Sequence, residues 1–195
     1  MTGRDVGTPA DATAAARELR RAGADAALVT GGHLDGDPVD AYAGPDGETR
    51  FERERVDTDA THGTGCTLSA AVAADLAGGA DPREAVAGAE LYMDRTLPRG
   101  LPYGGGPGPV NHLGATRTDA ATPDACAALR SAVGRLETAG AAVADAVPEV
   151  GTNVALAPPG ARDPDECVAV EGRLRATDRG VRPGRAEVVH RTGPA

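Results

Sequence analysis

The chain has 195 residues, of which 29 are acidic and 20 are arginine or lysine, and its formal net charge is −9. All of these basic residues are arginines, because the sequence contains no lysine. A lysine Schiff base and a Walker-type phosphate-binding lysine are therefore excluded. The acidic balance also argues against nucleic acid and anionic membranes as partners.

The same composition indicates where the protein works. There is no apolar run of about 18 residues and no charged-then-apolar amino terminus, which predicts a cytoplasmic protein. Acid excess, arginine in place of lysine and many small apolar residues are typical of a halophilic protein, although an acidic mesophilic protein would look the same. The cysteines lack C-x-x-C spacing, and the histidines are scattered, so neither a disulfide framework nor a metal site is predicted. The cysteines are Cys66, Cys126 and Cys167.

The first elements alternate between helix and strand. Thr8-Pro9-Ala10-Asp11 is a capped helix start, and the pattern predicts a helix over 12–22 that ends at Gly23. A buried strand over 26–30 should follow and end in a Gly31-Gly32 turn. A helix followed by a buried strand is typical of an open parallel sheet. Two further strands, over 40–42 and 50–56, should pair around the Gly44–Gly47 turn.

The run Thr61–Ser69 is the most informative motif. Two glycines flank Thr64 where a loop gives way to an apolar helix, so free backbone N–H groups should gather at the helix amino terminus. Such a nest binds an anion, typically a phosphate. Cys66 falls in the first turn, where the same field favours the thiolate form. The alternative is an ordinary glycine-rich turn, with Cys66 as a small core residue.

The next stretch predicts a second capped helix. Asp81 is a helix cap with Pro82 at the first helical position, and the helix should run to about Thr96. A loop rich in proline and glycine covers 97–109. We place a domain boundary near 114–121.

Beyond that boundary, a helix is predicted from Ala125 to about Val147, and Val168–Leu174 is predicted as a strand. The helix carries an apolar stripe that needs a partner, which we expect to be the first domain or another copy of the chain. The stripe consists of Leu129, Val133, Leu136, Val143 and Val147.

The order of these motifs resembles the carboxyl-terminal half of the hydroxymethylpyrimidine/phosphomethylpyrimidine kinases, ribokinase-like enzymes of thiamine synthesis. The strings THGTGCTLSAA and GPVNH carry the resemblance, which covers about residues 1–113. It implies an α/β fold, namely part of a ribokinase-like open sheet with helices on its faces. It begins in the middle of the family pattern, so we expect the front half of the kinase domain, with most of the pyrimidine pocket, to be absent.

The resemblance also assigns roles. Gly63, Thr64 and Gly65 would form the anion hole for the transferred phosphoryl group, and Cys66 would take the proton from the hydroxymethyl group of a pyrimidine. The turn Thr30–Gly32 would lie at the nucleotide phosphates, with Thr30 where many such kinases carry a lysine. The implied ligands are ATP, Mg²⁺ and a small pyrimidine, with no metal site of the protein's own.

The second part is similar to the start of the archaeal-type thiamine-phosphate synthase domain, often fused behind such kinases. PEVGTNVA, the acidic run 163–166 and EGRL carry this likeness over about 122–189. It implies a partial α/β domain, and Asn153 and Arg173 are candidate phosphate contacts, or else a turn residue and a surface arginine. We therefore divide the chain into a kinase half over 1–115 and a synthase-like segment over 116–195.

Three functions stay open at this point. The chain could be a pyrimidine kinase, a module that binds thiamine phosphates, or a non-catalytic fragment that complements another chain. The glycine loop and the GPVNH string favour kinase ancestry, whereas the absent half favours the third for activity of the chain alone.

Overall fold

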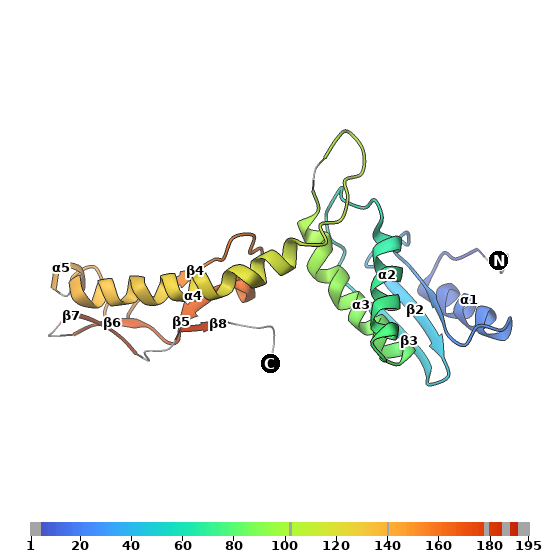
Figure 1. Cartoon of the computed structure of the whole chain (residues 1–195), viewed down its shortest axis with the longest axis horizontal. Helices are drawn as coiled ribbons and strands as arrows, with labels where there is room; N and C mark the ends of the chain where they lie inside the picture. The colour runs from blue at the N-terminus through green and yellow to red at the C-terminus, as the bar shows by residue number, and fades with distance from the viewer. Residues whose placement is uncertain (1–4, 102, 140, 178–179, 185–187, 191–195) are drawn as a thin grey trace. The chain divides into compact units, whose positions relative to one another are not determined.

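The computed structural model of the chain describes residues 5–101, 103–139, 141–177, 180–184 and 188–190. Its contacts divide it into two compact units, Met1–Asn111 and His112–Ala195 (Figure 1). Each unit is described by itself. No helix among the described residues is both long enough and apolar enough to cross a membrane.

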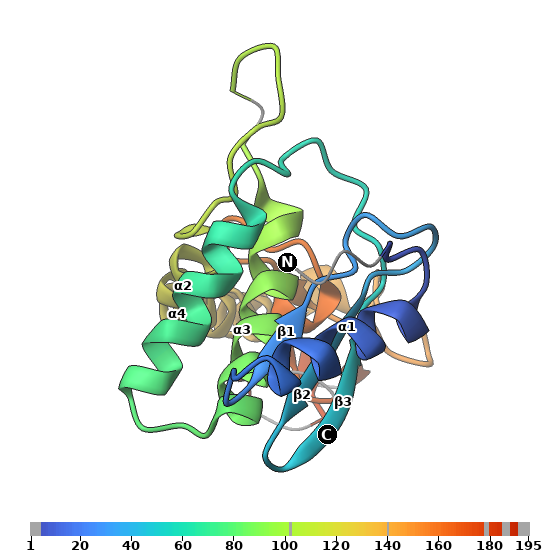
Figure 2. The ribbon, with the colours of Figure 1, turned by 90° about the vertical axis from the view of Figure 1, so that its right-hand side faces the viewer.

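The first unit is a small sheet with helices on both faces. The helices are α1 (Pro9–Arg21), α2 (Thr64–Ala77) and α3 (Pro82–Thr96), and a 3-10 turn follows at Leu97–Arg99. The strands are β1 (Ala27–Val29), β2 (Val39–Gly44) and β3 (Gly47–Glu52), in the order β1-β2-β3. Every residue of β2 is buried, because α1 covers one face of the sheet and the α2–α3 pair covers the other (Figure 2).

The local signals of this unit are confirmed. The Thr8 hydroxyl accepts the Asp11 N–H at 3.2 Å at the start of α1, and Gly23 follows the helix with a φ of 116°. Asp81 caps α3 by accepting the N–H groups of Arg83 and Glu84. The hairpin also forms around the predicted turn, with Val39 opposite Glu52 and Gly44 opposite Gly47, although its second strand ends at Glu52 and not at residue 56.

The predicted parallel arrangement is wrong for this sheet. Strand β1 is only half-buried and pairs antiparallel with β2, with Ala27 opposite Ala43. A parallel neighbour needs a crossover of a dozen or more residues, usually a helix. The segment from Thr30 to Pro38 is too short for that, so the chain simply folds back.

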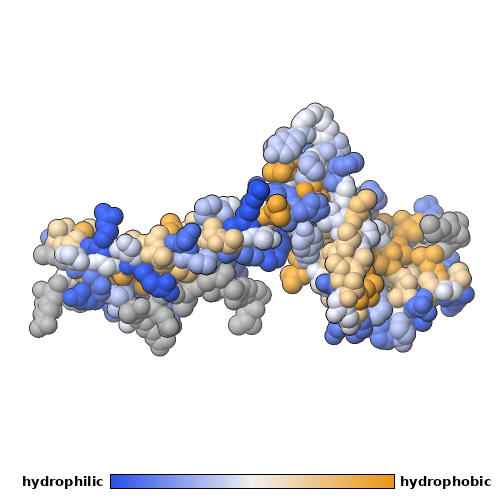
Figure 3. Space-filling view, in the orientation of Figure 1, coloured by the Kyte–Doolittle hydropathy of each residue, from blue (hydrophilic) through white to orange (hydrophobic). Residues whose placement is uncertain are grey.

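Helix α2 is apolar nearly all round. Its buried residues are Thr67 and Leu68, and it packs on α3 through the cluster that Leu68 forms with Ala89 and Met93. Small side chains of its outer face remain at the surface of the first unit (Figure 3), and Leu76 near its end is 44% exposed. The helix therefore has no polar outer face of the kind that surface helices usually show.

The second unit consists of one long helix against short strands. Its helices are α4 (Gly114–Ala139) and α5 (Ala141–Ala144), and a 3-10 turn lies at Pro164–Glu166. One sheet has the order β4-β5-β8, and β6 pairs with β7. The strands are β4 (Ala155–Leu156), β5 (Val168–Val170), β6 (Leu174–Thr177), β7 (Gly180–Pro183) and β8 (Val188–His190).

Three predictions for this unit are corrected. The helix begins at Gly114 and runs through Pro123, because the alanine-rich flanks keep the helix despite the one missing N–H. The predicted strand 168–174 is two strands, separated where Gly172 adopts a φ of 81°. The apolar stripe needs neither the first domain nor another copy, since Leu129 and its neighbours pack on Val168, Leu174 and Val181 of the same unit.

Candidate functional site

The amino terminus of α2 is built differently from those of α1 and α3. Gly63 precedes it with a φ of 80°, a left-handed conformation that glycine adopts without strain, and no side chain caps the helix. Thr8 and Asp81 cap the other two helices of the unit. The first N–H groups of α2 therefore have neither intrahelical acceptors nor a side-chain acceptor from the cap residue.

The first turn of α2 borders a cavity of about 380 Å³. Thr30 and Gly32, which follow β1, line it together with Thr64 and Gly65 of the first turn of α2. The structure thus brings together two segments that the sequence analysis assigned to nucleotide phosphates. The other lining residues are His33, Pro38, Asp40, Arg53, Glu54, Arg55, Val56, Thr58, Thr61, Leu68, Met93 and Leu97.

The remaining candidates lie beside the cavity rather than in its lining. Two hydrogen bonds fix the backbone of Gly31. Its N–H donates to Asp40 Oδ1 at 2.8 Å, and its carbonyl accepts the Leu34 N–H at 2.9 Å. Gly63 is the residue before α2, and Cys66 is exposed in the first turn of that helix. The roles of all seven candidate residues stay predictions.

A buried cluster of charges, which the sequence did not predict, contributes Asp40 and Arg53 to the lining of the cavity. Arg53 lies 2.8 Å (Nε) from Glu90 Oε2 and 3.4 Å (Nη2) from Asp40 Oδ2, and the two carboxylates are 5% and 1% exposed. Burial, followed by repulsion from Asp40, raises the pKa of Glu90 to about 8. Burial likewise raises the pKa of Asp94, one turn further along α3. A single arginine faces the two buried acids, and Glu90 therefore keeps its proton near neutral pH.

A signal for this cluster was present in the sequence. The buried positions of α3 include Ala85, Val86, Ala89, Glu90 and Met93, so Glu90 stands within the apolar stripe of an amphipathic helix. A carboxylate on such a stripe is almost never fully buried without a partner. Asp40 lies in β2 and Arg53 directly follows β3, so both are far from Glu90 in the sequence. Only tertiary packing brings them close to Glu90.

The Arg55 side chain is hydrogen-bonded to the loop that follows the Thr30–Gly32 turn. Its Nε and Nη2 donate to the carbonyls of Gly36 and Leu34, both at 2.6 Å, and its Nη1 donates to that of Gly32 at 3.3 Å. The guanidinium therefore fixes the loop 32–36 while its side chain lines the cavity.

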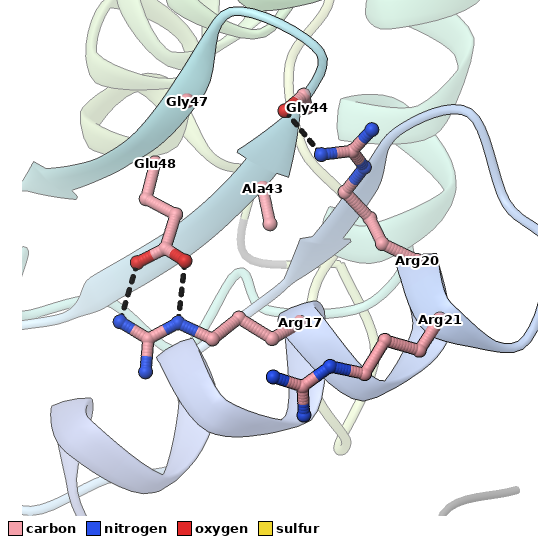
Figure 4. Close-up of a pocket in the computed structure, with 7 residues that line it drawn as sticks. All are labelled: Arg17, Arg20, Arg21, Ala43, Gly44, Gly47 and Glu48. Carbon is pink, nitrogen blue, oxygen red and sulfur yellow. Dashed lines mark hydrogen bonds and ion pairs between the residues drawn. The ribbon is translucent and has the colours of Figure 1, made fainter.

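A second cavity, of about 530 Å³, lies between α1 and the β2–β3 hairpin (Figure 4). Arg17 donates to the Glu48 carboxylate through Nε and through Nη2, the latter at 2.6 Å from Oε2. This hydrogen bonding lowers the pKa of Glu48. Arg20 donates to the Gly44 carbonyl at 2.6 Å. These contacts tie the helix to the hairpin. No predicted site residue lines this cavity, so we place the candidate site at the cavity between the Thr30 turn and α2.

Comparisons with known proteins identify the class to which the first unit belongs. Its fold is that of the ribokinase-like kinases, which confirms the predicted fold class. A Bacillus subtilis pyridoxal kinase solved as an ADP complex aligns with a TM-score of 0.55 and 35% identity, over 57% of this chain and 45% of that one. A Staphylococcus aureus pyridoxal kinase in complex with AMP-PCP and pyridoxal has the same TM-score and 29% identity, over 58% and 43%.

Residues 1–111 match the sequence model of the phosphomethylpyrimidine kinase family, and the chain belongs to this family. Residues 128–189 match the model of thiamine-phosphate synthase ThiN. Both predicted resemblances are confirmed. The chain is 42% identical over 112 residues to the hydroxymethylpyrimidine/phosphomethylpyrimidine kinase of Streptomyces coelicolor, covering 57% of this chain and 42% of the relative. It is 41% identical over 114 residues to the thiamine biosynthesis bifunctional protein ThiED of Geobacter sulfurreducens, covering 58% and 23%. The chain thus spans less than half the length of these relatives.

Cys66 should be the fastest of the three cysteines to react with a mild alkylating agent near neutral pH. It is exposed, whereas Cys126 and Cys167 are half-buried, and it lies in the first turn of α2. Brief labelling followed by mass-spectrometric mapping measures the three rates in one sample. If Cys66 reacts more slowly than the other two, its proposed role as a base loses its physical support.

Proposed function

We propose that residues 1–111 form the nucleotide-binding half of an ATP-dependent kinase that phosphorylates hydroxymethylpyrimidine or its phosphate in thiamine synthesis. The observation that carries the proposal is the single cavity that joins the turn after β1 to the uncapped amino terminus of α2. The kinase names of the relatives support the same reaction.

Each residue has a distinct part in this proposal. The N–H groups at the start of α2, which Gly63 precedes, bind and orient the transferred phosphoryl group. The Cys66 side chain takes the proton of the attacking hydroxymethyl group. The turn Thr30–Gly32 holds the remaining phosphates from the other side.

ATP, when bound, supplies the phosphoryl group, and Mg²⁺ neutralises part of its charge. The described residues contain no group of three or more side chains of the types that hold a metal ion. We propose that the ion enters with the nucleotide and is held mainly by phosphate oxygens and water, as is usual for Mg²⁺.

A second candidate function rests on the ThiN match over residues 128–189. The second unit could bind a thiamine phosphate without catalysis. Of the two phosphate contacts considered for it, Arg173 donates to the Val150 carbonyl at 3.1 Å and Asn153 is exposed. The hydrogen bond of Arg173 to the Val150 carbonyl gives this arginine a structural role. Phosphate binding by the second unit therefore has less support than the kinase proposal.

The kinase proposal predicts that the 195-residue chain alone shows negligible turnover in a coupled ADP-release assay. Because the chain matches less than half of its kinase relatives, we expect the pyrimidine to be positioned mainly by residues outside it. Positioning accounts for roughly 7–11 kcal/mol of barrier lowering in oriented reactions. Adding the front half of a related kinase, expressed separately, should restore turnover.

Cysteine variants make this assay specific. Cys66→Ala should abolish the restored turnover, whereas Cys126→Ala, in the second unit, should leave it unchanged. Turnover that survives Cys66→Ala would reject the base role. Robust turnover by the chain alone would show that it already positions its substrate.

A further inference from the structure

A cavity that binds phosphates needs a cation whose charge is not already neutralised. The chain has no lysine, so the side chain that carries a permanent positive charge must be an arginine. Two arginines line the cavity, Arg53 and Arg55. Their surroundings differ, and the difference decides between them.

Arg53 is already neutralised. Its guanidinium lies between the buried carboxylates of Asp40 and Glu90, at 3.4 and 2.8 Å, and the arginine side chain is 13% exposed. Drawing it toward a phosphate would leave the buried Asp40 carboxylate without its counter-charge, which is strongly unfavourable.

The positive charge of Arg55 is not compensated by an acidic partner among the described residues. The three acceptors of its guanidinium, the carbonyls of Gly32, Leu34 and Gly36, are neutral. Among the described residues, no carboxylate oxygen lies within 4.0 Å of this guanidinium. Asp37 accepts the backbone N–H of Arg55 at 3.0 Å, not an N–H of its guanidinium.

The clamp also leaves donors free. It uses one N–H on each nitrogen of the guanidinium, so each terminal nitrogen retains a second N–H for an incoming acceptor. A guanidinium held rigid by three carbonyls loses less side-chain entropy on binding than a free one. A guanidinium that donates through both terminal nitrogens can contact two oxygens of one phosphate.

We propose that Arg55 is the phosphate-binding cation of this cavity and that it acts opposite the amino terminus of α2. The inference rests on the proposed function only in taking a nucleoside polyphosphate as the ligand. Arg55 is a binding residue here, and no step of the transfer depends on it.

Calorimetry with tripolyphosphate, ATP and adenosine tests the proposal on the full chain. Arg55→Met should weaken binding of tripolyphosphate and ATP by roughly 10- to 100-fold, the loss expected for charge-assisted hydrogen bonds. Binding of adenosine should change less than about twofold, since it has no phosphate. Arg83→Met is the matched control, because Arg83 is an exposed arginine that does not line the cavity.

Salt dependence separates charge from loop structure. The fall of ATP affinity with salt should be shallower in Arg55→Met than in the parent chain, whereas Arg55→Lys, which keeps the charge and loses the clamp, should retain the parent slope. Unchanged tripolyphosphate binding in Arg55→Met would overturn the proposal and leave the kinase function standing. A parent that binds neither anion would overturn both. Arg55-dependent binding without turnover in the complemented assay would reject only the kinase function.

Discussion

Replacing Gly31 with alanine should destabilise the first unit by about 3–5 kcal/mol, combining overpacking with the loss of a buried, charge-assisted hydrogen bond. A Cβ at this position would overlap the Val39 carbonyl oxygen and lie 3.1 Å from Leu34 Cδ1. The oxygen belongs to β2, the buried central strand, and cannot move aside. The turn would have to withdraw from Asp40 and break the bond between the Gly31 N–H and that carboxylate.

The neighbouring glycine provides the control. A Cβ on Gly32 would meet no atom within 4 Å, so Gly32→Ala should be nearly neutral. All three tyrosines, Tyr42, Tyr92 and Tyr103, lie in the first unit, and the chain has no tryptophan, so tyrosine emission during urea unfolding reports on this unit alone. Equal unfolding midpoints for the two variants would mean that the turn has more room than the structure shows. Since domains are stable by only about 5–15 kcal/mol, the expected loss is a large part of the total.

Local signals in the sequence predicted the local structure well. Thr8 and Asp81 each supply a cap to backbone groups within three residues, and Gly63 meets a need for positive φ at its own position. Nothing distant has to be known for such predictions. The helix-entry loop that forms one wall of the cavity could therefore be found from sequence.

The errors concern partners that lie far apart in the chain. The direction of β1 depended on which strand it pairs with. The stripe beginning at Leu129 was assigned to the first domain or another copy of the chain, whereas Val168 and Leu174 of its own unit complete its core. The same applies to the site. The loops that contain Thr30 and Thr64 could be singled out from the sequence, but the cluster of Asp40, Arg53 and Glu90 required knowing that the hairpin lies against α3. A proline signal was also outweighed, since neighbouring helix-forming residues carried α4 through Pro123.

Glu90 should make the stability of the first unit fall as pH rises. Its pKa in the folded state is raised from 4.5 to about 8, first by burial and then by Asp40, so the folded chain holds a proton that the unfolded chain releases near pH 4.5. Between these values the native state binds more protons, and the free energy of unfolding therefore decreases with pH. Below pH 4.5 both states are protonated, and above about pH 8 neither is, so the loss is confined to this window.

Glu90→Gln should remove this loss, because an amide keeps the shape of the protonated acid and never ionises. At pH 5 the variant and the parent chain should unfold at similar urea concentrations. At pH 8.5 the variant should be more stable by about 1–3 kcal/mol, a value reduced from the full pKa shift because Arg53 partly compensates the charge. Asp94, whose pKa is also raised, should leave a small residual slope of the same sign.

Glu52→Gln is the control for this comparison, since Glu52 is an exposed acid at the end of β3 and should show the parent's pH dependence. Tyrosine emission again follows the first unit, and pH 8.5 lies below the range in which tyrosine ionises. If Glu90→Gln were instead less stable than the parent chain by a similar amount at pH 5 and at pH 8.5, Glu90 would be an ionised acid whose pKa is not raised. Arg53 would then be paired with an ionised Glu90, and the buried cluster would hold no proton.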